Sequence, residues 1–330
     1  MRVIGGPDLP DLPAAVDATV ITVGSFDGLH CGHRDVLARL TGRATDIGHA
    51  SVLVTFEPHP LEVLNPGAAP PLLTTREEKL ELLEPTGLDY VAIVPFTAEF
   101  ARRSATEFVD DVLIGRFRLA ELLVGHDHAF GRGREGDITL LRSLGASRGF
   151  AVDVVPPVLT PSGEAVSSTL VRRAIADRDL DRARVLLGRT YSVRGTVVAG
   201  AARGRLLGYP TLNVEPDSPR KLLPPDGVYA VRVVGSRGGF EGMMNLGGRP
   251  TFGDDRRTLE AHLFDADGDF YGDRVDVAFV ARLRDTVRFP DPDALVAQLR
   301  RDADAARRAL TAFAEPDNLS GSTHAPPSTP

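Results

Sequence analysis

The densest group of residues able to do chemistry is the segment GSFDGLHCGH, from Gly24 to His33. It follows an apolar run, contains glycines that permit a turn, and places His30 and His33 three residues apart at the predicted start of a helix. Backbone amides and the positive end of the helix dipole favour an anion at such a position. Two imidazoles can add hydrogen bonds and charge for a polyphosphate. The segment therefore predicts a phosphate-binding loop.

Two other interpretations of these histidines stay open. A pair that only caps or packs against the helix explains them without any ligand. A metal site is the second alternative, because His59, His126 and His128 also follow predicted strands. A zinc site would be expected to show a defined ligand set, and the sequence has neither a cysteine pair nor an HExxH motif.

Two further loops follow predicted strands. In TFEPHP, residues 55–60, two prolines fix the backbone around Glu57 and His59, and a rigid turn explains this segment nearly as well as a binding loop. The segment Gly131–Gly136 matches GxGxxG, but the residues HDHAF separate it from the preceding strand, so it lacks the tight first turn of a dinucleotide site. A basic loop that closes over a phosphate-bearing substrate is the better interpretation.

The second half of the chain offers more candidate ligands. Ser168, in VSSTLVR, alone is explained as a helix cap, but Arg172 one turn later favours a second anion site. Thr211 and Asn213 alternate along one predicted strand and therefore face the same way, and their oxygen atoms suit Mg²⁺ shared with ATP phosphates. Glu260 is a lone carboxylate in the apolar segment TLEAHLF, where a solvent-facing residue is a serious alternative to a functional one.

These loops need a framework that positions them. In the first half of the chain, short apolar strands alternate with helices, which predicts a parallel sheet covered on both faces, with ligands beyond the carboxyl ends of the strands. Helix starts at Thr75–Glu78 and Ser104–Glu107 fit the capping-box pattern. The predicted strands are 18–24, 51–56, 90–96, 119–125 and 151–158, and the predicted helices are 30–40, 77–83, 107–117 and 138–149.

The pattern changes near Leu187. Two helical stretches, 167–178 and 179–188, are followed by short β-branched segments without helices between them, which predict an antiparallel barrel or sandwich. These segments are 191–200, 209–214, 227–235, 240–247, 258–264 and 273–283. A last amphipathic helix is expected from Asp291 to Phe313. We predict an α/β domain over 1–187, a β-rich domain over 188–314 and a disordered tail over 315–330.

Composition limits the class of protein. The chain has 330 residues, with 38 Lys+Arg against 45 Asp+Glu and a net charge of −7, which argues against a nucleic-acid partner. Cys31 is the only cysteine, so an internal disulfide is impossible and a reducing cytoplasm is expected. No apolar run approaches the roughly 20 residues of a membrane span, and the N-terminal segment carries acids and prolines instead of a secretory signal.

Taken in order, these segments resemble the prokaryotic bifunctional riboflavin kinase/FAD synthetase family. The resemblance runs from about Thr19 to Ala306 and is carried by GSFDGLHCGH, TFEPHP, VGHDHAFG, VSSTLVR, GRLLGYPTLN, DGVYAV, NLGGRPTF and LEAHLFD. It implies a Rossmann-like nucleotidyltransferase domain for FMN adenylylation, followed by a six-stranded antiparallel β-barrel flavokinase domain. The implied reactions convert riboflavin and ATP to FMN, and then FMN and ATP to FAD and pyrophosphate.

The resemblance also implies roles for individual residues. ATP is expected in the first domain at Gly24, Ser25, Phe26, Asp27, His30, His33, Ser168, Thr169 and Arg172, and flavin at Phe56, His59, Asp127 and Phe130. In the second domain, ATP is expected at Gly204, Arg205, Gly208, Pro210, Thr211 and Asn213, with Thr211 and Asn213 as ligands of Mg²⁺. The expected catalytic residues are Glu260, as the base of the kinase reaction, and His30 and His33.

Two alternatives to this function stay open. One is a riboflavin kinase whose first domain binds nucleotide but is impaired in adenylyl transfer, because His128 stands where the family usually has an aromatic residue. The other is a flavin-binding carrier or regulator without turnover. The expected partners are the small molecules ATP, riboflavin and FMN, and a weak homo-oligomer is also left open.

Overall fold

The structure of the chain is a computed structural model that describes residues 1–125, 131, 136–200, 208–249, 254–266 and 268–313. Its contacts divide the chain into two compact units, of which the first ends at Ser168 and the second begins at Thr169. This division falls at the start of a helix. The domain boundary predicted after residue 187 stays a prediction.

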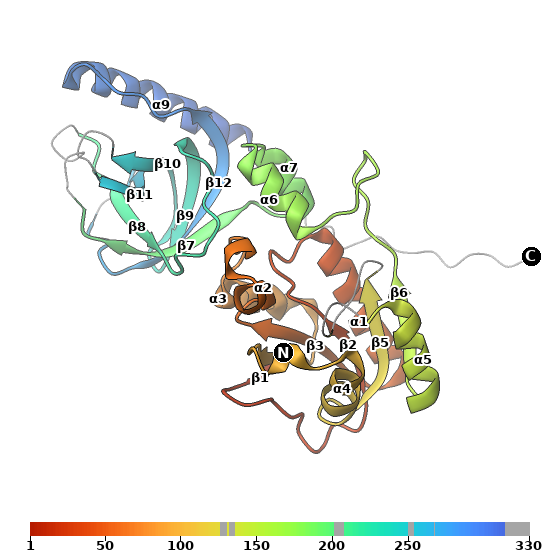
Figure 1. Cartoon of the computed structure of the whole chain (residues 1–330). Helices are drawn as coiled ribbons and strands as arrows, with labels where there is room; N and C mark the ends of the chain where they lie inside the picture. Colours follow the sequence, from red (N-terminus) through yellow and green to blue (C-terminus); the bar gives the residue numbers. More distant parts are fainter. Residues whose placement is uncertain (126–130, 132–135, 201–207, 250–253, 267, 314–330) are drawn as a thin grey trace, which may run out of the picture. The chain divides into compact units, whose positions relative to one another are not determined.

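The first unit is built on a six-stranded parallel sheet (Figure 1). The strand order is β1-β4-β3-β2-β5-β6, and every neighbouring pair is parallel. The predicted α/β class is therefore confirmed. The strands are β1 (Arg2–Gly5), β2 (Thr19–Val23), β3 (Ala50–Glu57), β4 (Tyr90–Pro95), β5 (Leu119–Gly125) and β6 (Ala151–Val155).

Helices cover both faces of this sheet. Successive strand residues point to opposite sides, so each strand contributes to the apolar packing on both faces. Val52 and Val54 of β3 pack in one apolar cluster with residues of α4 (Ala105–Glu107), η4 (Phe108–Ile114) and α5 (Ile138–Arg148). Leu53, between them, packs in a second cluster with residues of α1 (Cys31–Ile47) and α3 (Arg76–Leu83). Strands β2 to β5 are thus mostly buried on both faces, whereas the edge strand β6 has exposed residues.

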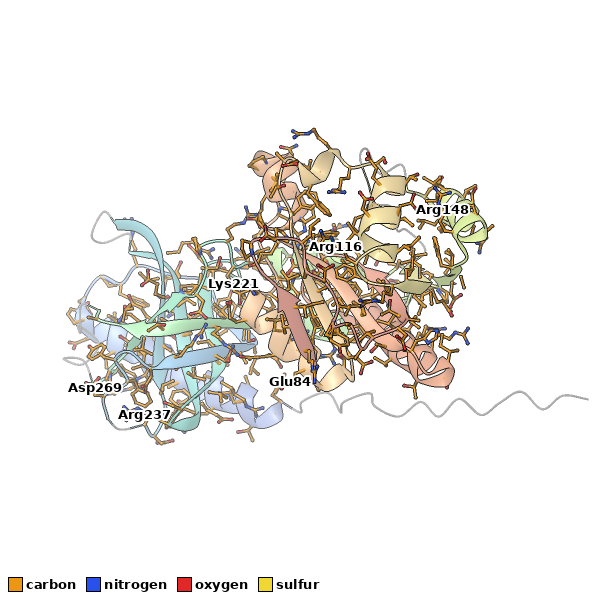
Figure 2. All side chains as sticks on the ribbon, turned by 90° about the horizontal axis from the view of Figure 1, so that it is seen from below. Glu84, Arg116, Arg148, Lys221, Arg237 and Asp269 are labelled. Atoms are coloured by element: carbon orange, nitrogen blue, oxygen red, sulfur yellow. The ribbon has the colours of Figure 1, made fainter. Side chains whose placement is uncertain are left out.

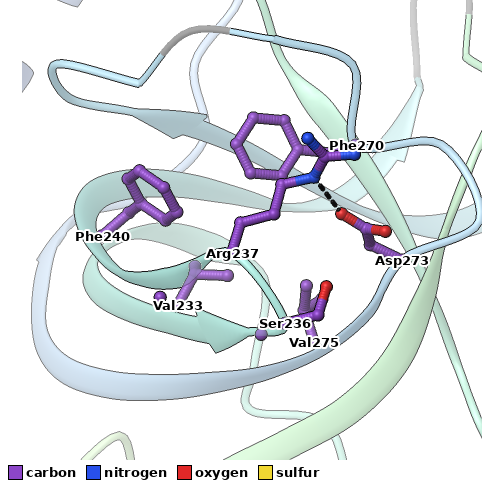
Figure 3. Close-up of a pocket in the computed structure, with 9 residues that line it drawn as sticks. Val233, Ser236, Arg237, Phe240, Phe270, Asp273 and Val275 are labelled. Carbon is purple, nitrogen blue, oxygen red and sulfur yellow. Dashed lines mark hydrogen bonds and ion pairs between the residues drawn. The ribbon is translucent and has the colours of Figure 1, made fainter.

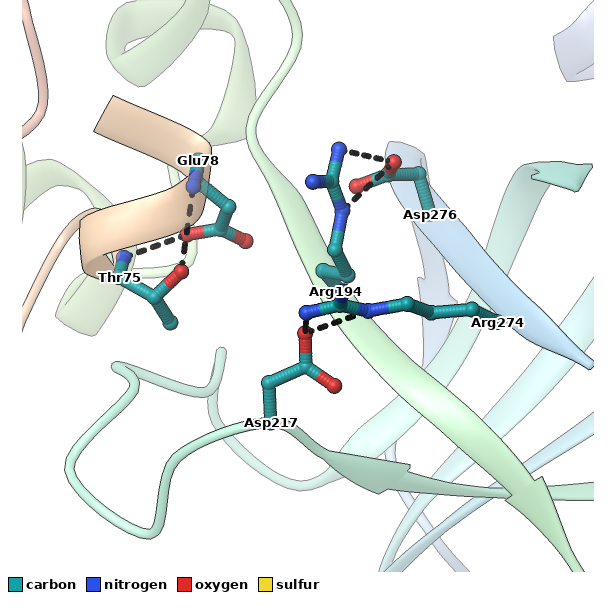
Figure 4. Close-up of polar contacts among 6 residues, drawn as sticks. All are labelled: Thr75, Glu78, Arg194, Asp217, Arg274 and Asp276. Carbon is teal, nitrogen blue, oxygen red and sulfur yellow. Dashed lines mark hydrogen bonds and ion pairs between the residues drawn. The ribbon is translucent and has the colours of Figure 1, made fainter. Parts of the chain in front are cut away.

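Both predicted capping boxes are confirmed. At the start of α3, the Thr75 hydroxyl accepts a hydrogen bond from the Glu78 amide (3.3 Å), and the Glu78 carboxylate accepts one from the Thr75 amide (2.7 Å; Figure 4). Ser104 and Glu107 make the same exchange at the start of α4, with distances of 3.1 and 2.8 Å. These side chains satisfy amides that a helix start otherwise leaves unpaired.

Several elements differ from the sequence prediction. The helix expected over 107–117 continues from α4 as a π-helix, η4, in which the Gly115 amide donates to the Asp110 carbonyl (3.0 Å). A Cβ added to Gly115 would lie 2.6 Å from the Asp111 carbonyl oxygen, so this wide turn needs glycine.

Strand β1 was not predicted, because its four residues give little pattern. Its register is set by pairing with β4, in which Arg2 lies opposite Tyr90. Short elements also occur at α2 (Pro60–Leu64), η1 (Pro66–Ala68), η2 (Glu84–Thr86) and η3 (Phe100–Arg102).

The second unit contains a closed barrel of six antiparallel strands in the order β10-β11-β8-β7-β12-β9, which confirms the predicted β-barrel. The strands are β7 (Ser192–Val198), β8 (Leu212–Pro216), β9 (Gly227–Gly235), β10 (Gly238–Arg249), β11 (Asp254–Leu263) and β12 (Arg274–Arg284). Two helices, α6 (Ser168–Ala176) and α7 (Leu180–Leu187), precede it, and α9 (Pro292–Ala312) follows.

Helix α9 runs along the outside of the barrel (Figure 1). Its Ala306 and Leu310 pack on Ala230, Met243 and Val280 of three barrel strands. Beside this apolar contact, the Arg284 guanidinium of β12 binds the buried Asp302 carboxylate of α9 at 2.6 Å. A carboxylate out of water needs such a partner, so this ion pair fixes where the helix lies.

Ion pairs also join neighbouring strands of the barrel. Arg194 of β7 lies opposite Asp276 of β12 and binds its carboxylate at 2.6 Å (Figure 4). At the β9–β10 hairpin, a small pocket is lined by Arg237, whose guanidinium lies 2.5 Å from the Asp273 carboxylate and 5.3 Å from the centre of the Phe270 ring (Figure 3). The guanidinium of Arg237 is paired with Asp273, so we interpret this pocket as part of the contacts that close the barrel between β9 and β10.

Other charged side chains lie at the surface. In the first unit, Arg116 pairs with Asp11 and Arg148 with Asp110, at 2.9 and 3.1 Å. Figure 2 labels the two arginines. The hydrogen bond and charge of Asp110 raise the pKa of Arg148. No helix in the described part of the chain combines the length and the apolar composition that a membrane crossing requires.

The ion pair beneath α9 yields a stability prediction. We expect Asp302→Ala to lower the free energy of unfolding of the barrel unit by about 2 to 3 kcal/mol, because Arg284 is left largely buried without its partner. The control is Asp265→Ala, which removes an exposed partner of Arg307 on the same helix and should cost at most about 1 kcal/mol. Urea titrations of the two variants measure both values, and equal losses would contradict the prediction.

Candidate functional site

The loop between β2 and α1 brings the two predicted histidines together. His30 is the residue before α1, and its Nδ1 accepts a hydrogen bond from the His33 amide (3.3 Å). The two rings stack with their centres 3.6 Å apart and their planes 18° apart, and the His33 ring also stacks on Phe26 at 4.5 Å. Both imidazoles thus lie at the amino end of a 17-residue helix, where an anion is favoured.

The backbone of this loop takes conformations that few residues adopt. Gly28 has φ of 81°, and a Cβ there would lie 2.7 Å from a Leu73 side-chain carbon. Phe26 and Leu29 also have positive φ, at 48° and 39°, although both carry bulky buried side chains. Such strain persists only where the surroundings enforce it, and it is concentrated at functional sites.

Asp27 holds the loop in place. Its buried carboxylate accepts hydrogen bonds from the Leu73 amide (3.0 Å), the Thr74 amide (2.9 Å) and the Thr74 hydroxyl (3.1 Å). Its carbonyl oxygen accepts one from the Ser168 hydroxyl (2.9 Å), at the start of α6. Asp27 was predicted among the ATP-binding residues, and its contacts support an indirect part in binding, by fastening the loop.

His33 carries an enclosed polar atom. Its Nδ1 is buried and has no hydrogen-bond partner among the described residues. Burial, followed by the nearby charges of His30 and Lys79, holds the pKa of His33 well below 6.5. The imidazole is therefore neutral at pH 7, and a buried ring nitrogen without a partner is a group that a ligand can satisfy.

Sequence reasoning missed Lys79. This residue lies in α3, and its ammonium donates to the carbonyl oxygen of Ser25 (2.9 Å), in the same loop as the histidines. Burial lowers the pKa of Lys79, while Asp27 and Glu57 raise it. In the sequence, Lys79 is distinguished only by its place directly after the Thr75–Glu78 capping box. Such a position does not indicate a function.

The residues expected to contact flavin fall into two groups. Phe56 belongs to an aromatic cluster at the end of β3, with ring centres 5.5 Å from Phe96 and 6.1 Å from Phe100. His59 begins α2, where its Nδ1 accepts from the Leu61 amide (3.2 Å), so this segment is a helix start and not only a rigid turn. Asp127 and Phe130 lie outside the described residues, as do His126, His128 and most of the GxGxxG segment.

In the barrel, the strand register brings the second set of candidates together. Glu260 of β11 lies directly opposite Asn213 of β8 on one side and Asn245 of β10 on the other. Its neighbours in the strand, Leu259 and Ala261, are buried, so Glu260 points to the other face. The Thr258 hydroxyl donates to its carboxylate (3.3 Å). Glu260 is therefore a half-buried carboxylate beside an amide side chain, and not an isolated surface charge.

Thr211 requires a correction. It was expected within the same strand as Asn213, but β8 begins at Leu212, so Thr211 lies in the turn before the strand and the alternation argument does not apply to it. The preceding residue, Pro210, accepts a hydrogen bond through its carbonyl from His262 Nδ1 (2.9 Å). Gly208 has φ of 80° in this turn. Gly204 and Arg205 lie outside the described residues.

The donor atoms of the barrel fit a hard cation. Hydroxyl, amide and carboxylate oxygens are the ligands that Mg²⁺ takes, and Asn213 and Glu260 are in register on adjacent strands. The metal-site alternative raised for the histidines of the first half involves His126 and His128, which lie outside the described residues. The described residues contain no group of three His, Cys, Asp or Glu side chains placed to hold a metal ion.

Comparisons with known proteins agree with both halves of the molecule. A family model described as FAD synthetase matches residues 12–170, and one described as riboflavin kinase matches residues 187–310. The bifunctional riboflavin kinase/FMN adenylyltransferase of Escherichia coli K12 is 40% identical over 295 residues, which cover 89% of this chain and 93% of that protein. The enzyme of the same name from Haemophilus influenzae is 33% identical over 93% of this chain and 98% of its own length.

A solved structure shares the fold. The crystal structure of a protein described as a macrolide-efflux protein from Streptococcus pneumoniae superposes with a TM-score of 0.79 and 32% identity. The match covers 92% of this chain and 95% of that one. The likeness therefore extends over the parallel sheet and the barrel.

The lowered pKa of His33 predicts how stability depends on pH. The unfolded chain takes up a proton on His33 below about pH 6.5, whereas the folded protein does not, so protons favour unfolding in this range. The free energy of unfolding should fall by up to about 1.4 kcal/mol per pH unit from this group as pH drops below 6.5. We expect His33→Gln to have a shallower slope between pH 7 and 5 in urea titrations, and parallel slopes would disprove this origin.

Proposed function

The chain belongs to the family of bifunctional riboflavin kinase/FMN adenylyltransferases, and on this basis we propose which residues carry each of its two reactions. The protein is a riboflavin kinase, which phosphorylates riboflavin to FMN with ATP, and an FAD synthetase, which joins FMN and the adenylyl group of ATP to give FAD and pyrophosphate. The observation that carries the residue assignment is the stacked His30–His33 pair, with an enclosed, unpartnered Nδ1, at the start of α1.

We assign adenylyl transfer to the loop between β2 and α1. The phosphate of FMN is already an anion at neutral pH, so its attack on the α-phosphate of ATP needs alignment and charge stabilisation, not a general base. In this proposal His30 and His33 hydrogen-bond the phosphates of ATP, together with the loop amides that follow Gly24. The Ser168 hydroxyl donates to the Asp27 carbonyl oxygen of this loop. The resemblance adds Thr169 and Arg172 to the proposal as further phosphate ligands.

We assign riboflavin phosphorylation to Glu260 and the barrel residues opposite it on the neighbouring strands. A hydroxyl group is a poor nucleophile, so the terminal ribityl hydroxyl needs a base to accept its proton, and in this proposal Glu260 is that base. Asn213, directly opposite, and Thr211 would hold Mg²⁺ with their oxygens. When bound to these residues, Mg²⁺ would supply positive charge to offset the charge of the phosphoryl group. We further propose that the protein works in the cytoplasm; a weak homo-oligomer stays a prediction.

The base assignment is tested by Glu260→Gln. We expect the rate of FMN formation to fall roughly a hundredfold or more, the usual contribution of a positioned base, while FMN adenylylation stays within about twofold of wild type. Chromatography of reactions with riboflavin, or with FMN, plus ATP and Mg²⁺ measures the two rates separately. Glu215→Gln, at an exposed position of β8, is the matched control and should change neither. Loss of both activities in a folded Glu260 variant would contradict the assignment.

The phosphate-loop assignment is tested by His33→Ala. Removing a donor to the phosphates should slow FAD formation by roughly 10²- to 10³-fold, whereas riboflavin phosphorylation continues. His49→Ala, just beyond the other end of α1, controls for loss of an imidazole in the same unit. An equal loss of phosphorylation would argue against separate sites. Absence of FAD formation in the wild-type protein itself would instead favour the nucleotide-binding, adenylylation-impaired alternative.

A further inference from the structure

Lys79 is a cation that the two assigned mechanisms do not use. It lies in α3, whose start is fixed by the Thr75–Glu78 capping box and by the hydrogen bonds of Thr74 to the Asp27 carboxylate. Helix α3 is thus fastened directly to the loop that carries the histidines. The Lys79 side chain extends from this helix to the loop, so both its backbone and its ammonium group are fixed in position.

The contacts of Lys79 point to the phosphate loop. Its ammonium donates to the Ser25 carbonyl at 2.9 Å and to the Thr55 hydroxyl at 3.5 Å, and that hydroxyl in turn donates to the same carbonyl at 3.3 Å. The amino group of Lys79 therefore lies between the ends of β2 and β3, at the carboxyl edge of the sheet. An ammonium carries three protons, so two acceptors in the described part of the chain leave one for an incoming ligand.

Charged groups from several elements affect the pKa of Lys79. Burial is the largest effect and lowers the pKa of Lys79, Asp27 from the loop and Glu57 from β3 raise it in part, and Arg76 from α3 lowers it. On the other side, the charge of Lys79 is one of the causes that lower the pKa of His33. Lys79 and the His33 imidazole are therefore electrostatically coupled.

We propose that Lys79 is a positioning residue for adenylyl transfer, which holds the loop after β2 through the Ser25 carbonyl and adds a fixed positive charge beside His30 and His33. The inference rests on the assignment of adenylyl transfer to this loop. A polyphosphate bound at the imidazoles would meet a cation that is already oriented and largely out of water, and such a charge acts without reorganisation. Its task is to hold geometry and charge in place, and no bond is made or broken at Lys79.

Three substitutions in the full-length protein separate the two parts of this role. Lys79→Arg keeps the charge, Lys79→Gln keeps a donor for the Ser25 carbonyl without the charge, and Lys79→Met removes both. Arg39→Met, which deletes an exposed cation on α1, is the matched control. The readouts are the rates of FMN adenylylation and riboflavin phosphorylation, and the titration of His33 followed by NMR with labelled histidine.

We expect Lys79→Met to slow adenylylation by roughly tenfold to a hundredfold, Lys79→Gln somewhat less, and Lys79→Arg least. The pKa of His33 should rise in the Met and Gln variants and stay near the wild-type value in the Arg variant. Phosphorylation should be unchanged in all of them. If the Met variant fails to fold, the Gln and Arg variants still decide between a role in charge and a role in packing.

Two results would overturn the proposal. One is adenylylation within twofold of wild type in Lys79→Gln and Lys79→Met. The other is an equal loss in the Arg and Gln variants without a change in the His33 titration, which would mean that Lys79 only packs. His33→Ala is measured alongside: if it retains adenylylation, the site assignment itself fails, whereas normal Lys79 variants beside an inactive His33 variant reject only the inference about Lys79.

Discussion

One buried carboxylate, that of Asp27, determines the shape of the first site. A carboxylate removed from water is stable only when hydrogen bonds replace its hydration, and Asp27 obtains three of them from Leu73 and Thr74. Because these donors directly precede α3, the loop with the histidines and that helix take up one fixed arrangement. The strained backbone at Phe26 and Leu29, and the contact between Lys79 and Ser25, both depend on it.

The two reactions differ in what they require of the protein, and in the proposed assignment the two sites differ accordingly. FMN brings its own anionic nucleophile, and the first site offers donors and positive charge at a helix start, where a loop can follow the phosphates. Riboflavin brings a neutral hydroxyl, and the second site offers a carboxylate, Glu260, held on rigid strands opposite Asn213. A base must be held more precisely than a charge, because proton transfer fails over small displacements whereas electrostatic attraction falls off slowly with distance.

Local patterns in the sequence predicted the framework well. Apolar strands alternating with helices gave the parallel sheet, both capping boxes were confirmed, and the spacing of His30 and His33 predicted their common face. What depends on distant parts of the chain was not predictable. The contact of Lys79 with Ser25 crosses 54 residues, and strand β1 takes its register from β4. Thr211 was misplaced for a related reason, since the hydrogen bonds of β11 and β7 decide where β8 begins.

The proposed phosphate site must bring groups that can carry positive charge close together, and such groups repel each other. Three groups that can carry positive charge, His30, His33 and Lys79, lie at the carboxyl edge of one sheet. Burial keeps the His33 imidazole neutral, and burial also lowers the pKa of Lys79, an effect that the charges of Asp27 and Glu57 oppose. The neutral His33 imidazole therefore adds no repulsion at pH 7. In the proposed assignment, the negative charges of a polyphosphate would favour protonation of His33, so the site would gain positive charge when the anion is bound.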